Sequence, residues 1–177
     1  MRRGNPRRTS RCTPIHDPLC GLRPPEVSRR YLLAGGIAAV VVALDLFTKR
    51  LAALNFVEDR VVVIPDFLEF TYHENPGAAF SLFQSGGEII GVVVIIILGV
   101  VLWSLRTERP TTEVVVFGLI IGGAVGNLAD RVFRGPGLLD GRVIDWIDLW
   151  WIPTFNVADM AVTIAVSVLV IHSWVTN

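Results

Sequence analysis

Carboxylates and amides recur in short motifs along an otherwise very apolar chain. The first motif is Gly-Gly-Ala-Val-Gly-Asn-Leu-Ala-Asp-Arg (122–131), and the second is Phe-Asn-Val-Ala-Asp (155–159). Between them, Asp145 stands in the stretch Val-Ile-Asp-Trp (143–146). A carboxylate at the end of a hydrocarbon-length helix is costly unless it has a task, so Asp130, Asp145 and Asp159 are candidates for function.

Two aspartates can hydrolyse a peptide bond when they share one proton. The ionised carboxylate takes a proton from the attacking water, while the protonated one polarises the carbonyl and donates to the leaving nitrogen. Close placement in a partly dry site raises the pKa of one carboxyl and keeps the pair singly protonated. The structural alternatives are a helix cap for Asp159, an ion pair with Arg131 or another neighbour for Asp130, and a surface loop for Asp145.

Other catalytic arrangements lack the residues that they need. Lys49 is the single lysine, and the neighbouring Thr48 does not face it on a helix. The three histidines are scattered, without the His-Glu-x-x-His pattern of a metalloprotease. Cys12 and Cys20 match no zinc pattern. We therefore expect neither a metal nor a cofactor.

The composition is that of a small polytopic membrane protein. Of 177 residues, 52% are hydrophobic, and the mean hydropathy is +0.56. The apolar runs predict four transmembrane helices, over residues 31–54, 89–105, 113–128 and 155–174. The second run is near the shortest length that can cross a bilayer.

The head of the chain is strongly basic. Eight arginines stand among the first 30 residues, against Asp17 and Glu26. We interpret residues 1–29 as a disordered cytoplasmic arm and residues 30–177 as one domain with four membrane spans. Nucleic-acid binding by the arm is the less favoured alternative, and a cleaved signal peptide is disfavoured because no small-residue cleavage site follows the first apolar run.

A cytoplasmic arm places both termini inside and leaves outer segments at about 55–88 and 131–154. All the polar residues that are candidates for function then lie toward the outer face: Asp45, Lys49, Asn75, Asn127, Asp130, Arg131, Asp145, Asn156 and Asp159. Residues 61–64 and 67–72 predict short strands, and Asn-Pro-Gly (75–77) predicts a turn, so a small extracytoplasmic sheet should rest on the membrane. The following Gly77, Ala78, Ala79 and Phe80 suit the lining of a groove, although ordinary packing accounts for them equally well.

Five motifs, in order and at compatible spacing, resemble the lipoprotein signal peptidase (signal peptidase II) family. They are Asp-x-x-Thr-Lys (45–49), Asn-x-Gly-Ala-Ala-Phe (75–80), the 122–131 motif, Val-Ile-Asp-Trp-Ile (143–147) and Phe-Asn-x-Ala-Asp (155–159). The match runs from about Tyr31 to the C-terminus. Leu46 and Pro76 depart from the residues that are common in the family, Gln and Thr, away from the aspartates.

The resemblance implies an aspartyl endopeptidase of the bacterial plasma membrane, with four helices and an extracytoplasmic β-cradle. Such an enzyme removes signal peptides from diacylglyceryl-modified prolipoproteins, cutting before the lipidated cysteine. The catalytic aspartates map onto Asp145 and Asp159, with Asp130 supporting the site through Arg131. Asp45, Lys49, Asn75, Asn127, Asn156 and Ala158 would surround the pair.

The expected partners are prolipoproteins and membrane lipid, with no nucleic acid, and we expect a monomer. Two other functions fit the sequence less well. A small four-span transporter or proton relay would need carboxylates near the bilayer midplane, whereas these cluster at one face. A non-enzymatic scaffold would leave the polar residues without a role.

Overall fold

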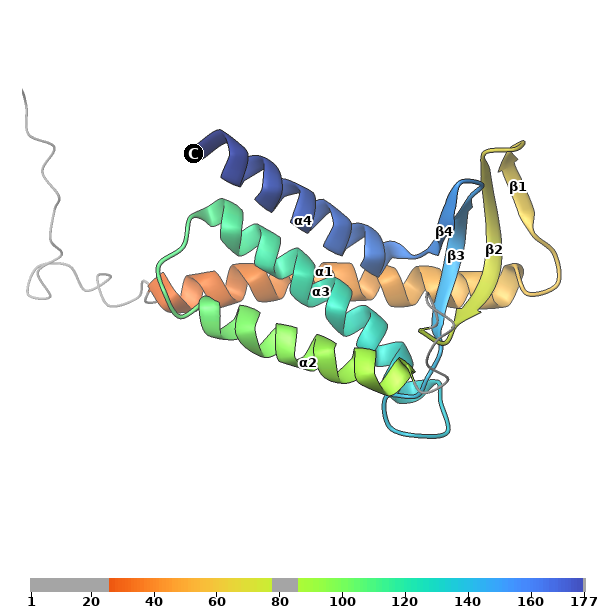
Figure 1. Ribbon diagram of the computed structural model, residues 1–177, viewed down its shortest axis with the longest axis horizontal. Coiled ribbons are helices and arrows are strands. Elements are labelled where there is room, and N and C mark those ends of the chain that lie inside the picture. The colour runs from red at the N-terminus through yellow and green to blue at the C-terminus, as the bar shows by residue number, and fades with distance from the viewer. Residues whose placement is uncertain (1–25, 78–85, 177) are drawn as a thin grey trace, which may run out of the picture.

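The computed structural model describes residues 26–77 and 86–176. These residues form four helices and a four-stranded antiparallel sheet that lies across one end of the helices (Figure 1). The helices are α1 (Glu26–Asn55), α2 (Gly86–Ser104), α3 (Thr111–Phe133) and α4 (Val157–Thr176). The strands are β1 (Val61–Ile64), β2 (Leu68–Asn75), β3 (Val143–Leu149) and β4 (Ile152–Phe155). Most of the basic arm, both cysteines and residues 78–80 lie outside the described ranges.

Three helices are long and apolar enough to cross a membrane: α1, α3 and α4. The apolar part of α2, Glu88–Ser104, is shorter. Helix α1 begins at Glu26, five residues before the predicted start, so the last residues of the proposed arm are helical. Helix α3 continues to Phe133 where residue 128 was predicted as its end, so Asp130 and Arg131 are helical residues.

Glycines bring α3 close to two other helices. A side chain at Gly122 would meet Val41 of α1, and one at Gly123 would lie 2.4 Å from the backbone oxygen of Ala158 in α4. Small residues at such positions let apolar helices pack backbone to backbone. Helix α3 therefore fixes the middle of α1 and the start of α4 relative to each other.

The sheet has the strand order β1-β2-β3-β4. The first outer segment contains two strands, as predicted, but β3 and β4 form in a segment where no strand was predicted. Strand β4 is an edge strand, which is where Pro153 can stand without removing a ladder hydrogen bond. Trp146 of β3 packs edge-on against Phe70 of β2, with ring centroids 5.1 Å apart.

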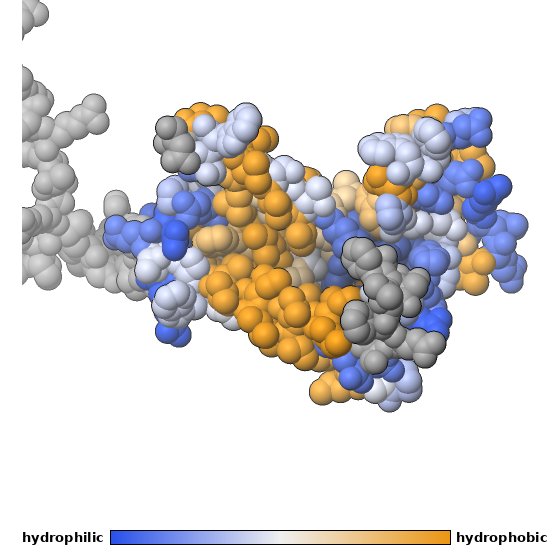
Figure 2. All heavy atoms as spheres, in the orientation of Figure 1, coloured by the Kyte–Doolittle hydropathy of each residue, from blue (hydrophilic) through white to orange (hydrophobic). Residues whose placement is uncertain are grey.

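Apolar side chains cover the helices between two polar ends (Figure 2). Large hydrophobic residues are exposed along this belt, such as Ile96 and Val100 on α2 and Ile171 on α4, each about three-fifths exposed. Exposed apolar surface of this extent is stable in a bilayer, because there it contacts lipid and not water. The chain is a membrane protein, and its sheet lies at one end of the apolar belt.

Candidate active site

The two central aspartates come from neighbouring elements at the sheet end of the helices. Asp145 is the third residue of β3, and Asp159 is in the first turn of α4. Strand β3 pairs with β2 so that His73 stands opposite Asp145 and Asn75 opposite Val143. Both aspartates line one cavity of about 190 Å³.

Asp145 is almost fully buried, with 2% of the residue exposed. Its Oδ2 accepts a hydrogen bond from Asn75 Nδ2 at 2.9 Å, and its Oδ1 accepts one from Asn156 Nδ2 at 2.7 Å. Burial raises the pKa of Asp145 above its ordinary value, and the nearby charge of Asp159 acts in the same direction against the lowering effect of the amide donors. Compared with an exposed aspartate, Asp145 therefore holds its proton more tightly.

Asp159 is bound through both carboxylate oxygens at the start of a helix. Its Oδ1 accepts from Asn127 Nδ2 at 2.8 Å, and its Oδ2 accepts from the backbone N–H of Asn156 at 3.3 Å. In return, Asn156 Oδ1 accepts the backbone N–H of Asp159 at 3.0 Å, which completes a capping box. Asp159 is thus a helix cap as well as a cavity residue.

Each of the three asparagines is oriented by a group that can only donate. Lys49 Nζ donates to Asn127 Oδ1 at 2.9 Å, the backbone N–H of Gly77 donates to Asn75 Oδ1 at 2.9 Å, and Asp159 N–H fixes Asn156. Because each amide oxygen is held in this way, each NH₂ group must turn toward a carboxylate. The site therefore presents only donors to its two aspartates.

Beneath the pair lies a buried ion cluster. Lys49 is fully buried and uses its three donors on Asp45 at 2.7 Å, Asp130 at 2.8 Å and Asn127. Asp130 also binds Arg134 at 2.6 Å, and Asp45 accepts the backbone N–H of Ala158 at 2.9 Å. Two cations and two anions balance, which is the arrangement that makes such burial tolerable.

The direct partners of Asp130 are residues other than Arg131, and its support of the site through Arg131 stays a prediction. Asp130 is ion-paired with Lys49 and Arg134, and its remaining hydrogen bond comes from the backbone N–H of Ile144 at 3.4 Å. Arg134 was not among the predicted site residues. Its spacing of four residues from Asp130 within one helix was the signal that could have identified it.

Arg131 lines the cavity of the two aspartates instead. It is 6% exposed, and its Nη1 has no hydrogen-bond partner among the described residues. A side chain at Gly77, whose φ is +89°, would meet this guanidinium at 3.3 Å, so glycine allows the turn after β2 to approach it. The cavity thus contains an unused buried donor beside two carboxylates.

The structure brings together the predicted site residues that fall in its described ranges. They are Asp45, Lys49, Asn75, Gly77, Asn127, Asp130, Arg131, Asp145, Asn156, Ala158 and Asp159, which hydrogen-bond, ion-pair or contact one another in a single network. The predicted groove residues Ala78, Ala79 and Phe80 lie outside those ranges.

The chain is similar in sequence to a family of known proteins. A family model described as Signal peptidase (SPase) II matches residues 37–175. The lipoprotein signal peptidase of Rhodococcus jostii (strain RHA1) is 40% identical over 155 residues, covering 85% of this chain and 78% of the relative. That of Chlorobium phaeobacteroides (strain DSM 266 / SMG 266 / 2430) is 37% identical over 149 residues, covering 77% and 88%.

A solved bacterial membrane enzyme has a similar fold. It superposes with a TM-score of 0.70 and is 32% identical, and the match covers 83% of this chain and 93% of that one. The matched family region, residues 37–175, includes every described strand and most or all of each helix. The similarity therefore extends over the whole membrane-embedded and sheet-forming part of the chain.

Proposed function

Because the chain belongs to the signal peptidase II family of membrane aspartic endopeptidases, we propose that Asp145 and Asp159 are its catalytic pair. The substrates are diacylglyceryl-modified prolipoproteins, and the cut falls immediately before the lipidated cysteine. One observation carries the assignment: two carboxylates share one cavity in which the surrounding asparagines are all fixed as donors.

The two carboxylates divide the work of hydrolysis. Asp159, ionised at the start of α4, takes a proton from a water that attacks the scissile carbonyl. Asp145, kept neutral by its burial, donates a hydrogen bond to that carbonyl and then a proton to the leaving nitrogen. No metal or cofactor is needed for these steps.

The residues around the pair orient it and the substrate. Asn75, Asn127 and Asn156 direct the carboxylates, while Lys49 with Asp45 and Asp130 holds Asn127 in place. The unused Nη1 of Arg131 is a donor for a peptide carbonyl that enters the cavity. Gly77, Ala78, Ala79 and Phe80 form part of the groove that the peptide enters.

The proposed topology has four spans in the bacterial plasma membrane. Helix α2 is the fourth span, because it packs against α3 and large apolar side chains, such as Ile96 and Val100, are exposed along it. The basic arm, residues 1–29, is cytoplasmic, so both termini are inside, and the sheet and the active site are at the outer face. Residues 30–177 form one peptidase domain that acts as a monomer on substrates already held in the lipid.

The test compares two substrates in the same bilayers. The full chain is reconstituted with a diacylglyceryl-modified prolipoprotein and, separately, with the same protein left unmodified, at equal concentrations. We expect the shortened product from the modified protein and poor cleavage of the unmodified one. Equal rates would contradict specificity for lipoproteins, and cleavage of neither would contradict the function itself.

A further inference from the structure

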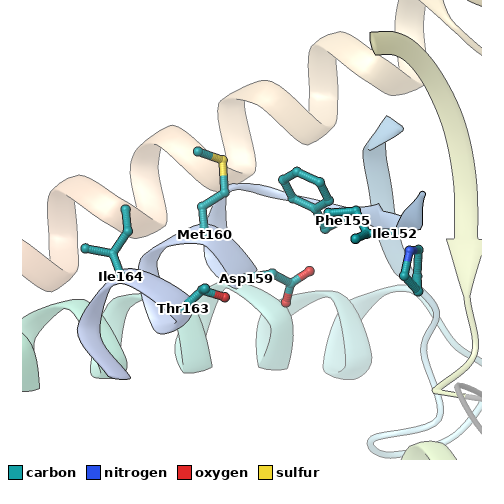
Figure 3. Close-up of a pocket in the computed structure, with 7 residues that line it drawn as sticks. Ile152, Phe155, Asp159, Met160, Thr163 and Ile164 are labelled. Atoms are coloured by element: carbon teal, nitrogen blue, oxygen red, sulfur yellow. The ribbon is translucent and has the colours of Figure 1, made fainter. Parts of the chain in front are cut away.

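A second cavity adjoins Asp159, of about 410 Å³. It lies between β4 and the first turns of α4, and Figure 3 shows Ile152 and Phe155 facing Met160, Thr163 and Ile164, with Asp159 among them. Among the described residues, Asp159 alone lines both this β4–α4 cavity and the cavity of the aspartate pair. The walls of the two cavities otherwise differ, because carboxylates, amides and a guanidinium line the first together with apolar side chains from α2, α3 and β3, whereas apolar side chains dominate the second.

The β4–α4 cavity opens where the bilayer would be. Met160 and Ile164 are 42% and 51% exposed and belong to Val157–Val175, a stretch that is long and apolar enough to span a membrane. Lipid hydrocarbon would therefore meet these residues directly. A chain in the outer leaflet could enter between β4 and α4 without crossing water.

The chemistry of the substrate requires lipid close to the pair. The lipid is attached at the sulfur of the cysteine whose nitrogen is in the scissile bond, so only Cα and Cβ separate that nitrogen from the sulfur. Bond lengths of about 1.5 Å place the sulfur within roughly 4 Å of the nitrogen. Whatever holds the glyceryl group must therefore adjoin Asp145 and Asp159. Hydrocarbon placed against the carboxylates and the guanidinium of the pair's cavity would deprive these charged groups of polar partners, so the apolar β4–α4 cavity suits it better.

We propose that the β4–α4 cavity binds the first part of an acyl chain of the diacylglyceryl group, while the peptide around the scissile bond occupies the cavity of the aspartate pair. The inference rests on the proposed function and assigns a place to its lipid. Asp159 then stands at the junction between the lipid and the peptide. The cleaved bond is selected by its distance from the lipid attachment.

The cavity acts on the position of the substrate more than on its affinity. An acyl chain that moves from the bilayer into an apolar cavity leaves one hydrocarbon environment for another, so little apolar surface is removed from water. Holding the chain nevertheless fixes the scissile carbonyl against the pair, and misplacement by an ångström can cost large factors in rate. A filled cavity should therefore lower kcat and leave KM nearly unchanged.

The experiment fills the cavity from α4. Thr163→Phe adds a ring inside it, and Ser167→Phe adds the same ring one turn further along the helix, outside both cavities. Each variant and the wild type are assayed in bilayers on two substrates with the same peptide, one carrying palmitoyl chains and the other butyryl chains. With palmitoyl chains, we expect Thr163→Phe to lower kcat about tenfold or more and Ser167→Phe to have little effect.

The butyryl substrate separates the explanations. Its short chains make little use of the cavity, so wild type and Thr163→Phe should cleave it at similar rates. An equal loss on both substrates would mean that the cavity holds a peptide side chain and would overturn the proposal, as would undiminished cleavage of the palmitoyl substrate. Failure of the wild type to cleave the palmitoyl substrate would instead contradict the proposed function.

A second measurement does not require the Thr163→Phe variant to fold. The Asp145→Asn variant is loaded with a substrate whose acyl chains carry a photoreactive diazirine next to the glyceryl group. After irradiation, we expect cross-links in the α4 peptide that contains Met160 and Ile164. Cross-links confined to Ile90 and Val94 of α2, which line the cavity of the aspartate pair, would overturn the proposal.

Discussion

At the scale of single residues, asparagine side chains stabilise two carboxylates that lie close together in a buried site. Two carboxylates in one small cavity would repel each other if both were ionised, and burial makes that worse. Three asparagines lower the energetic cost of burying the carboxylates by donating hydrogen bonds to them. The amide oxygen of each asparagine accepts from a group that can only donate, which fixes the amide's orientation. These hydrogen bonds hold Asp145 and Asp159 in fixed positions in the cavity.

Replacing either carboxylate should stop catalysis and preserve the fold. Asp145→Asn or Asp159→Asn removes one proton-transfer step, so cleavage should fall by about 100-fold or more. The control is Asp148→Asn, three residues along β3 and outside the cavity of the pair. Product formation is measured in bilayers, with circular dichroism as the check on folding. Near-normal turnover by either of the first two variants would remove that residue from the pair.

The pH dependence should move when Asn75 is replaced. Its amide donates to Asp145 and lowers the pKa of that carboxyl, so Asn75→Ala should raise the pKa further. Activity needs the proton on Asp145, which is lost as pH rises through this pKa. The alkaline limb of kcat should therefore shift to higher pH. Glu74→Ala is the control, because adjacent strand residues point to opposite faces, and an unshifted limb in Asn75→Ala would contradict the role of Asp145 as the acid.

Asp130 should behave as a structural partner of the pair. Asp130→Asn takes one carboxylate from Lys49 and from Arg134, and breaking a buried ion pair costs roughly 3–5 kcal/mol. We expect a lower unfolding temperature in detergent with an unchanged pH profile in the remaining activity. Asp140→Asn, at an exposed acid in the next loop, is the control for loss of charge. A displaced acidic or alkaline limb would show that Asp130 exchanges protons in the reaction.

At the scale of elements, hydrophobic patterning was enough to predict the helices but not the strands that carry the site. The apolar runs indicated all four helices, although α3 was predicted too short because Asn127, Asp130 and Arg131 look like an exposed end. In the structure, Asn127 and Asp130 bind partners from other elements, and such long-range contacts leave no local pattern. For the same reason β3 was missed, because its Asp145 and Asp148 resemble loop residues until β2 is paired with them.

The sequence motifs were a better guide to the site than to the fold around it. They identified nearly every member of the polar network. Each motif is a short run of neighbouring residues, so its polar residues lie together on one helix or strand. They did not indicate which groups pair. The partners of Asp130 follow from α1 and the last turn of α3 lying side by side, and the orientation of Asn127 follows from Lys49, 78 residues away.

The junction of α3 and α4 should be sensitive to a single methyl group. In Gly123→Ala the new carbon would lie 2.4 Å from the oxygen of Ala158 and 2.7 Å from Val162, so the helices must separate. Overpacking of this kind costs about 1–3 kcal/mol and would displace Asp159 as well. We expect a lower unfolding temperature and reduced cleavage. Gly99→Ala, where no atom lies within 4 Å, should change neither, and an unaffected Gly123→Ala would show that the helices are not in close contact.

At the scale of the whole molecule, the asymmetry between the two ends of the helices sets the topology. The sheet and the polar network occupy one end (Figure 1). At the other end, Arg30 at the start of α1 donates to the backbone oxygen of Thr107 at 2.6 Å, in the turn between α2 and α3. That end also holds Arg29, Arg106 and Arg109, so the positive-inside tendency supports the proposed cytoplasmic location of this end without the residues that precede α1.

Deleting residues 2–25 should therefore leave both orientation and peptidase activity largely intact. The deletion removes six arginines and both cysteines, so a Glu108→Cys substitution in the α2–α3 turn gives a single thiol, at a side chain that is 95% exposed. The matched control is the full-length chain with Cys12→Ser, Cys20→Ser and Glu108→Cys. In sealed vesicles of cytoplasmic-side-in orientation, a membrane-impermeant maleimide should label neither protein until the vesicles are opened, and the two should cleave prolipoprotein at similar specific rates. Labelling of the deletion variant from outside would mean that the arm sets the orientation. Correct insertion with lost activity would mean instead that the arm takes part in binding the substrate or in holding the four helices together.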